Sequence, residues 1–95
     1  MTSSRLVFRV HVIQRMAQRK IASAEIRAVL ATGETIEEYP HETPYPSRLV
    51  LGWSGSRPLH VVVAENPGEA ETIVITMYEP APNEWEPGFR RRRPA

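Results

Sequence analysis

At Gly33 the spacing of the apolar residues changes from the period of a helix to that of a strand. Before Gly33, apolar side chains follow a helical spacing over about 10–19 and again over a segment that begins at Ser23. After it, four stretches have the composition and alternation of strands, at 34–39, 47–53, 58–65 and 72–79. A helical pair followed by consecutive strands predicts an α+β fold, in which an N-terminal helical hairpin packs on a four-stranded antiparallel sheet.

The second predicted helix carries signals for both of its ends. Ser23 is a residue type favoured as an N-cap, and Glu25 lies in the first turn, where the helix dipole favours an anion. Gly33 stands where a C-terminal glycine cap belongs. The helix is therefore predicted to start at Ser23 and to end just before Gly33.

The length of the chain and its cysteine content limit its organisation. Ninety-five residues suffice for one domain with one core, which we assign to residues 1–80, and the Pro- and Arg-rich stretch 81–95 is predicted to be an irregular tail with a mobile end. The absence of cysteine excludes disulfides and thiolate metal sites. The first residues lack the apolar core of a signal peptide, and no apolar run is long enough to span a membrane. We therefore expect a cytoplasmic protein.

Charge is distributed unevenly along the chain. Residues 1–30 hold six cations and one glutamate, a net charge of +5, whereas residues 34–86 hold two arginines and ten glutamates, a net charge of −8. Four consecutive arginines follow at 90–93. The basic segments could meet phosphate, or opposite charges could pair within the fold or with a partner.

Alternation along the last two predicted strands separates two faces of the sheet. One face is apolar, includes Ile73, and is expected to be the core beneath the helices. The other is expected to be more open and to carry His60, Thr76 and Tyr78 together with Val74.

The segments "HVIQRMAQRKI", "GETIEEYP", "LHVVVAE" and "IVITMYEP", in this order, resemble a family of small bacterial proteins, domain of unknown function 4258 (DUF4258). The resemblance covers about residues 8–80. Two motifs carry it, H-x-x-x-R-x-x-x-R at His11, Arg15 and Arg19, and T-x-Y-x-P at Thr76, Tyr78 and Pro80.

DUF4258 in turn resembles the RelE- and MqsR-type toxins of bacterial toxin–antitoxin systems. This resemblance implies a RelE-like fold, metal-independent cleavage of RNA, and a small antitoxin, encoded next door, as protein partner. The sheet of this chain departs from the basic sheet of such ribonucleases, because most of its charged residues are glutamates.

RNA cleavage without a metal requires a base for the 2′-hydroxyl, an acid for the leaving 5′-oxygen, and cations around the phosphorus. Histidine and tyrosine suit the proton transfers, and arginine binds phosphate through two parallel hydrogen bonds. The candidate catalytic residues are His11, Tyr78 and His60. The candidate substrate-binding residues are Arg15, Arg19 and Thr76.

Structural roles remain open for the basic residues of the first helix. His11, Arg15 and Arg19 fall on one broad helical face, because each step of four residues turns by roughly 40°. The two arginines could pair with glutamates of the sheet, and His11 could cap the start of the helix.

Structural roles are also open for the residues of the strands and the tail. His60 could be a cross-strand partner, while β-propensity alone accounts for Thr76 and Tyr78. Trp53 is expected in the core, and Trp85 is expected to anchor the tail. His41, in a proline-rich loop, is expected to have no role.

Two functions are compatible with these features. The first is a toxin-like endoribonuclease that acts on RNA. The second is a non-catalytic module that binds a small partner protein through the basic helical hairpin or a sheet edge, and self-association is compatible with either. The histidine spacing suggests no zinc site, and we expect no cofactor and no membrane association.

Overall fold

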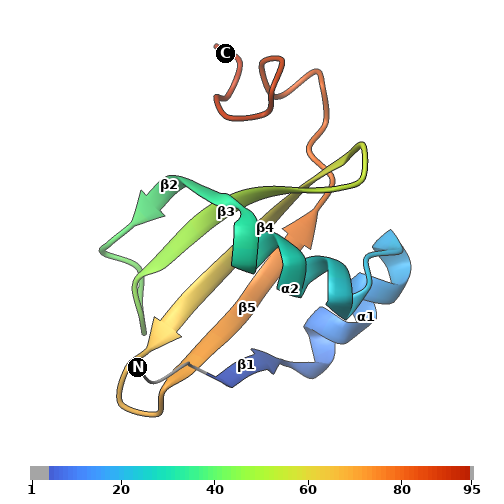
Figure 1. Cartoon of the computed structure of the whole chain (residues 1–95). Helices are drawn as coiled ribbons and strands as arrows, with labels where there is room; N and C mark the ends of the chain where they lie inside the picture. Colours follow the sequence, from blue (N-terminus) through green and yellow to red (C-terminus); the bar gives the residue numbers. More distant parts are fainter. Residues whose placement is uncertain (1–4, 95) are drawn as a thin grey trace.

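The computed structural model describes residues 5–94, so that residues 1–4 of the predicted domain and residue 95 of the predicted tail lie outside the described part. Figure 1 shows two helices on one side of a twisted sheet, which confirms the α+β class. The elements, in chain order, are β1 (Arg5–Phe8), α1 (Val10–Arg19), α2 (Ser23–Thr32), β2 (Glu34–Tyr39), β3 (Ser47–Ser54), β4 (Arg57–Asn66) and β5 (Glu71–Tyr78).

The sheet differs from the predicted four-stranded antiparallel one. It has five strands in the order β1-β5-β4-β3-β2, and β1 runs parallel to β5 at the edge of the sheet. β2 to β5 form the predicted antiparallel meander. The additional strand, only four residues long, pairs Arg5 with Glu71 and ends where Phe8 pairs with Val74.

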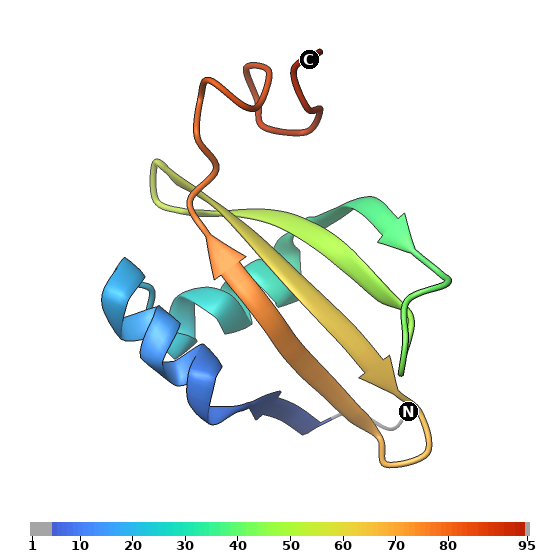
Figure 2. The ribbon, with the colours of Figure 1, turned by 180° about the vertical axis from the view of Figure 1, so that it is seen from behind.

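The core lies between the helices and one face of the sheet, and the opposite face, called the open face below, is turned to the viewer in Figure 2. The fully buried members of the core cluster are Val12, Ile26, Val29, Leu59, Val61, Val63, Val74 and Met77. Gly52 lets α2 approach β3 closely, because a Cβ atom at this position would lie 2.8 Å from Cγ2 of Val29. β3 thereby supports the buried side of α2.

The ends of α2 differ in detail from the sequence expectation. The N-cap is Ala22, not Ser23, and the Ala22 N–H donates to Oε1 of Glu25 over 2.9 Å. This hydrogen bond lowers the pKa of the Glu25 carboxyl. At the other end, Gly33 has φ −78° and is not left-handed; its N–H donates to the Val29 carbonyl oxygen over 2.7 Å. Glycine is required there because a Cβ would collide with the carbonyl oxygens of Val29 and Leu51.

A β-bulge in β5 reverses part of the predicted side-chain alternation. Val62 pairs with Thr76, but the next residue, Val63, pairs with Val74, so that one residue of β5 is skipped in the pairing. An extra residue shifts the pleat by one position, so the side chains before the bulge in β5 point to the opposite face from the one that strict alternation predicts. Val74, expected on the open face, therefore joins the core under the helices, whereas Ile73, expected in the core, pairs with Ala64 outside the core cluster.

The tail after Pro80 is irregular, as its prolines predict, and it is anchored on the open side of the sheet. Trp85 is 1% exposed and forms a bridge with Arg92. Two tail arginines pair with glutamates of β2, Arg90 with Glu34 and Arg92 with Glu37. The Trp85 anchor and these two ion pairs hold the tail against the fold.

Candidate functional site

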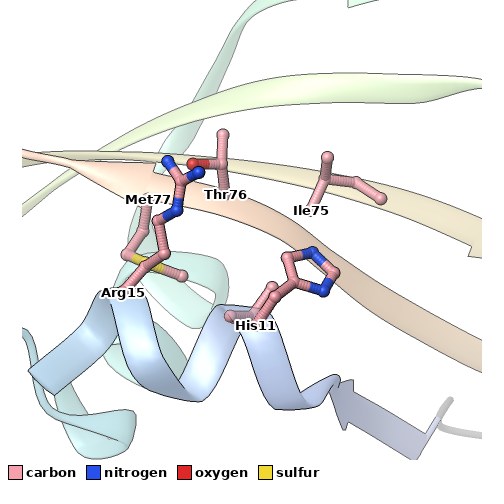
Figure 3. A pocket seen from close by; sticks show the side chains of 6 residues that line it. His11, Arg15, Ile75, Thr76 and Met77 are labelled. Carbon is pink, nitrogen blue, oxygen red and sulfur yellow. The ribbon is translucent and has the colours of Figure 1, made fainter.

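Helix α1 lies beside the part of β5 that β1 leaves uncovered. β1 pairs with β5 only as far as Val74, and α1 packs along the following residues. His11 and Arg15, one helical turn apart and both exposed, face this edge. Figure 3 shows the Arg15 guanidinium beside the Thr76 side chain and the His11 ring turned toward Ile75.

These side chains line a cavity of about 260 Å³, called the α1–β5 cavity below. Its lining consists of His11, Val12, Arg15, Ile75, Thr76 and Met77. Three of the six predicted site residues thus meet, although Thr76 is far from the other two in sequence. The arrangement joins a group able to transfer a proton, a cation able to bind an oxyanion, and a hydroxyl.

Arg19 is held by β5 at the next turn of the helix. Its guanidinium donates to the Met77 carbonyl oxygen over 2.5 Å and lies 3.4 Å from Oγ1 of Thr76. Arg57 in turn donates to the carbonyl oxygens of Arg19 and Lys20 over 3.0 and 2.8 Å. Arg19 thus fastens the end of α1 to β5 and places the Thr76 hydroxyl.

His11 and Arg15 remain available at the cavity. Neither side chain makes a hydrogen bond or an ion pair with another described residue, so the expected pairing of Arg15 with a sheet glutamate is not found. The expected helix cap by His11 is not found either, since the N-cap of α1 is Arg9 without a side-chain cap bond.

A second cavity, of about 330 Å³, adjoins the first on the open face and is called the open-face cavity. His11 and Ile75 line both cavities. The open-face cavity is also lined by Arg9 and by residues of β2 and the loop after it, among them Tyr39, Glu42 and Tyr45. Sequence reasoning missed these four, because nothing in the sequence brings the loop 40–46 beside the start of α1.

His60 and Tyr78 lie in a different place, under the tail. His60 is 0% exposed, although its face was expected to be open, because Trp85 packs against it with ring centroids 4.4 Å apart. Its Nε2–H donates to the Phe89 carbonyl oxygen over 2.9 Å, which leaves Nδ1 to accept from the Tyr78 hydroxyl at 3.3 Å. Both residues are absent from the linings of the two cavities, and His60 has the geometry of a buried cross-strand partner of Tyr78.

Burial changes the proton affinity of this pair. It lowers the pKa of His60, partly offset by the hydrogen bond to the Phe89 carbonyl and by the nearby Glu37 carboxylate, and it raises the pKa of Tyr78. The imidazole is therefore neutral at pH 7, and its tautomer is set by its two partners.

The lowered pKa of His60 predicts a loss of stability on acidification. The unfolded chain binds a proton near the ordinary histidine pKa of about 6.5, while folded His60 binds it only at a lower pH. The free energy of unfolding of the wild type should therefore fall as the pH drops from 7 to 5. His60→Gln should remove the contribution of this histidine to the pH dependence of the free energy of unfolding, which urea denaturation at each pH measures. A wild-type free energy that stays flat from pH 7 to 5 would contradict the prediction.

Much of the acidic charge of the sheet is paired with arginines of the same chain. Arg5 pairs with Glu71, and Arg48 pairs with Glu65 over 2.5 Å. Glu37 is partly desolvated, which raises its pKa, but hydrogen bonds from Arg92 and Tyr39 outweigh this effect and lower the pKa overall. Two of the four tail arginines are likewise engaged with β2, so the tail offers less free positive charge than its sequence suggests.

The exposed aromatic residue Trp53 was expected in the core. It is 48% exposed and packs edge-on against Phe89, with ring centroids 6.1 Å apart. Its neighbour Gly52 faces α2, so alternation places Trp53 on the open face. Trp85 is the tryptophan that is buried.

Neither a metal cluster nor a membrane helix is found within residues 5–94. No three side chains of the types that ligate metals gather there in a position to hold an ion. Within the same range, no helix combines the length and the apolar character needed to cross a bilayer.

Comparison with known proteins gives a family and nothing finer. No curated protein and no solved structure matches the chain. The profile of a family described as domain of unknown function, DUF4258, matches residues 8–79, a span that contains both helices, both cavities and all strands except the first residues of β1. On this match over most of its length, the chain belongs to the DUF4258 family.

Proposed function

We propose that this protein is a toxin-like, metal-independent endoribonuclease of a toxin–antitoxin system, with its site at the α1–β5 cavity. The observation that carries the proposal is the meeting of His11, Arg15 and Thr76 in one exposed cavity, where the first two have no partner among the described residues. Unpaired polar side chains that converge on a cavity are typical of binding and catalytic sites.

The side chains suggest a division of roles on RNA. Neutral His11 removes the proton from a 2′-hydroxyl, whose oxygen then bonds to the adjacent phosphorus while the bond from phosphorus to the 5′-oxygen breaks. Arg15 binds the phosphate oxygens as charge develops, and the Thr76 hydroxyl, placed by Arg19, donates a further hydrogen bond. The leaving oxygen takes its proton from solvent, since Tyr78 lies elsewhere. The products are a 2′,3′-cyclic phosphate and a 5′-hydroxyl.

The charge pattern also supports RNA as the substrate. The sheet glutamates Glu34, Glu37, Glu65 and Glu71 are paired with arginines of the chain itself. At the start of α1, by contrast, Arg9 and Arg15 line the two cavities without an ion pair to a described residue. Positive charge available for phosphate is thus concentrated where His11 lies.

The test is cleavage of a labelled single-stranded RNA by the purified protein in EDTA over a series of salt concentrations. We expect cleavage that weakens steeply with salt, because neutralised phosphates release counterions. Arg15→Gln should lower the cleavage rate by about 10²-fold. Arg91→Gln, which removes an exposed tail arginine, is the matched control and should cut like the wild type. Absence of cleavage by the wild type at every salt concentration would overturn the proposal.

One observation favours a second function, the binding of a partner protein such as an antitoxin. Three large apolar side chains of α1 and β5 are exposed, Val10 at 73%, Ile13 at 53% and Ile75 at 44%. Val10 and Ile13 lie one turn apart on α1, and neighbouring exposed apolar side chains are typical of protein interfaces. A toxin requires an interface for its antitoxin in addition to its catalytic site, so the two functions are compatible. If the wild type cuts no RNA, the alternative is a non-catalytic module that binds a partner protein.

A further inference from the structure

We propose that the open-face cavity binds a guanine base of single-stranded RNA, next to the phosphate held at the α1–β5 cavity. This inference rests on the proposed function for its class of ligand, and it adds a base preference. The two cavities adjoin, because His11 and Ile75 line both of them. A nucleotide whose phosphate is bound at Arg15 therefore places its base in the open-face cavity.

The shape and lining of the open-face cavity suit a flat aromatic ligand. Its volume of about 330 Å³ is at the lower end of the range for small-molecule sites. Val62, Ala64 and Ile73 supply apolar surface from the sheet, and Tyr39 and Tyr45 add two aromatic rings. Stacking on aromatic side chains is the usual way in which proteins hold unpaired RNA bases.

Both tyrosines are held by their surroundings. The Tyr39 hydroxyl donates to Oε1 of Glu37, which fixes the direction of its ring. Tyr45 is half-buried and lies between Pro44 and Pro46, whose rings restrict the backbone on either side. A stacking surface that is already rigid loses little conformational entropy when a base binds.

Glu42 supplies the polar contact that selects the base. Its N–H donates to the Tyr39 carbonyl oxygen over 3.3 Å, so one turn connects the carboxylate with the aromatic lining. Glu42 forms no ion pair with another described residue. A carboxylate only accepts hydrogen bonds, and guanine alone has two adjacent donors, N1–H and the N2 amino group, on its Watson–Crick edge. Each of the other three bases has a single donor group on that edge, with an acceptor next to it.

The test measures binding separately from cleavage, with fluorescent RNA hexamers whose 2′-oxygens are methylated. One hexamer is all uridine, and three others carry a single central G, A or C. We expect the G hexamer to bind the wild type at least about tenfold more tightly than the others. Tyr45→Ala should weaken binding of the G hexamer by about tenfold or more, and Tyr45→Phe, which keeps the ring, should restore it.

Glu42→Gln should lower the affinity for the G hexamer to that for the A hexamer and leave the all-uridine hexamer unaffected. Trp53→Ala and Glu69→Gln are the matched controls, since each removes an exposed side chain of the same kind outside the cavity, and both should bind like the wild type. Equal affinity of the wild type for all four hexamers would overturn the base site, even if it cleaves RNA. Tight binding of the G hexamer without cleavage of unmodified RNA would support the base site and overturn only the nuclease.

Discussion

Replacing Trp85 with alanine is expected to lower the free energy of unfolding by about 3–5 kcal/mol, the usual cost of removing a buried tryptophan. Its side chain is 1% exposed, and its ring packs perpendicular to that of His60 at 4.4 Å. The Arg92 guanidinium also lies over the Trp85 ring, 4.7 Å from its centroid. The variant would leave a cavity above His60 and release the segment that supplies the Phe89 carbonyl to it.

Urea denaturation measures this loss, and Trp53→Ala provides the comparison. Trp53 is 48% exposed, so its replacement should cost less than about 1 kcal/mol. The chain has two tryptophans, so each variant keeps one as a fluorescent probe of unfolding. A loss in Trp85→Ala that is below about 1 kcal/mol, and so no larger than that expected for Trp53→Ala, would contradict the prediction.

The helices and the meander were predictable because their signals are local. The apolar spacing places α1 and α2 within a residue of their observed bounds, and the four predicted strands all exist. β1 was missed because four residues are too few to show alternation, and because its parallel pairing with β5 joins segments far apart in the chain.

The bulge and the tail required information that a single sequence does not contain. Strict alternation is the only rule available for assigning sheet faces, and one skipped residue between Val74 and Thr76 reverses it. Trp85 lies in a proline-rich segment without regular structure, so its position over His60 depends on tertiary packing alone.

The candidate site was predictable in part. The helical spacing of His11 and Arg15 places both on one face, and that face does meet Thr76. The same reasoning grouped His60 and Tyr78 with them, although these two lie under the tail and are absent from the cavity lining. Strand alternation assigns a face of the sheet but not a position along it, and it does not predict which segment covers that face.

The largest effect on activity is expected from His11→Ala, which should slow RNA cleavage by about 10²–10⁴-fold, the usual contribution of a general base or acid. His11 is the one histidine in the lining of the α1–β5 cavity, and histidine is the residue type best suited to transfer protons in catalysis. The measurement is the single-turnover rate with labelled RNA in EDTA. His41→Ala is the matched control, because His41 is an exposed histidine outside both cavities and its removal should leave the rate unchanged.

Tyr78→Phe distinguishes this site from the alternative at the His60 pair. Tyr78 donates its hydroxyl to a buried imidazole, so its loss should affect stability and leave the cleavage rate near that of the wild type. The opposite result, full activity in His11→Ala and none in a folded Tyr78→Phe, would place the chemistry at His60 and Tyr78. Since Trp85 and the Phe89 carbonyl cover that pair, the tail would then have to move away before RNA could reach it. Such a requirement predicts that shortening the tail raises activity, whereas a site at His11 predicts no gain.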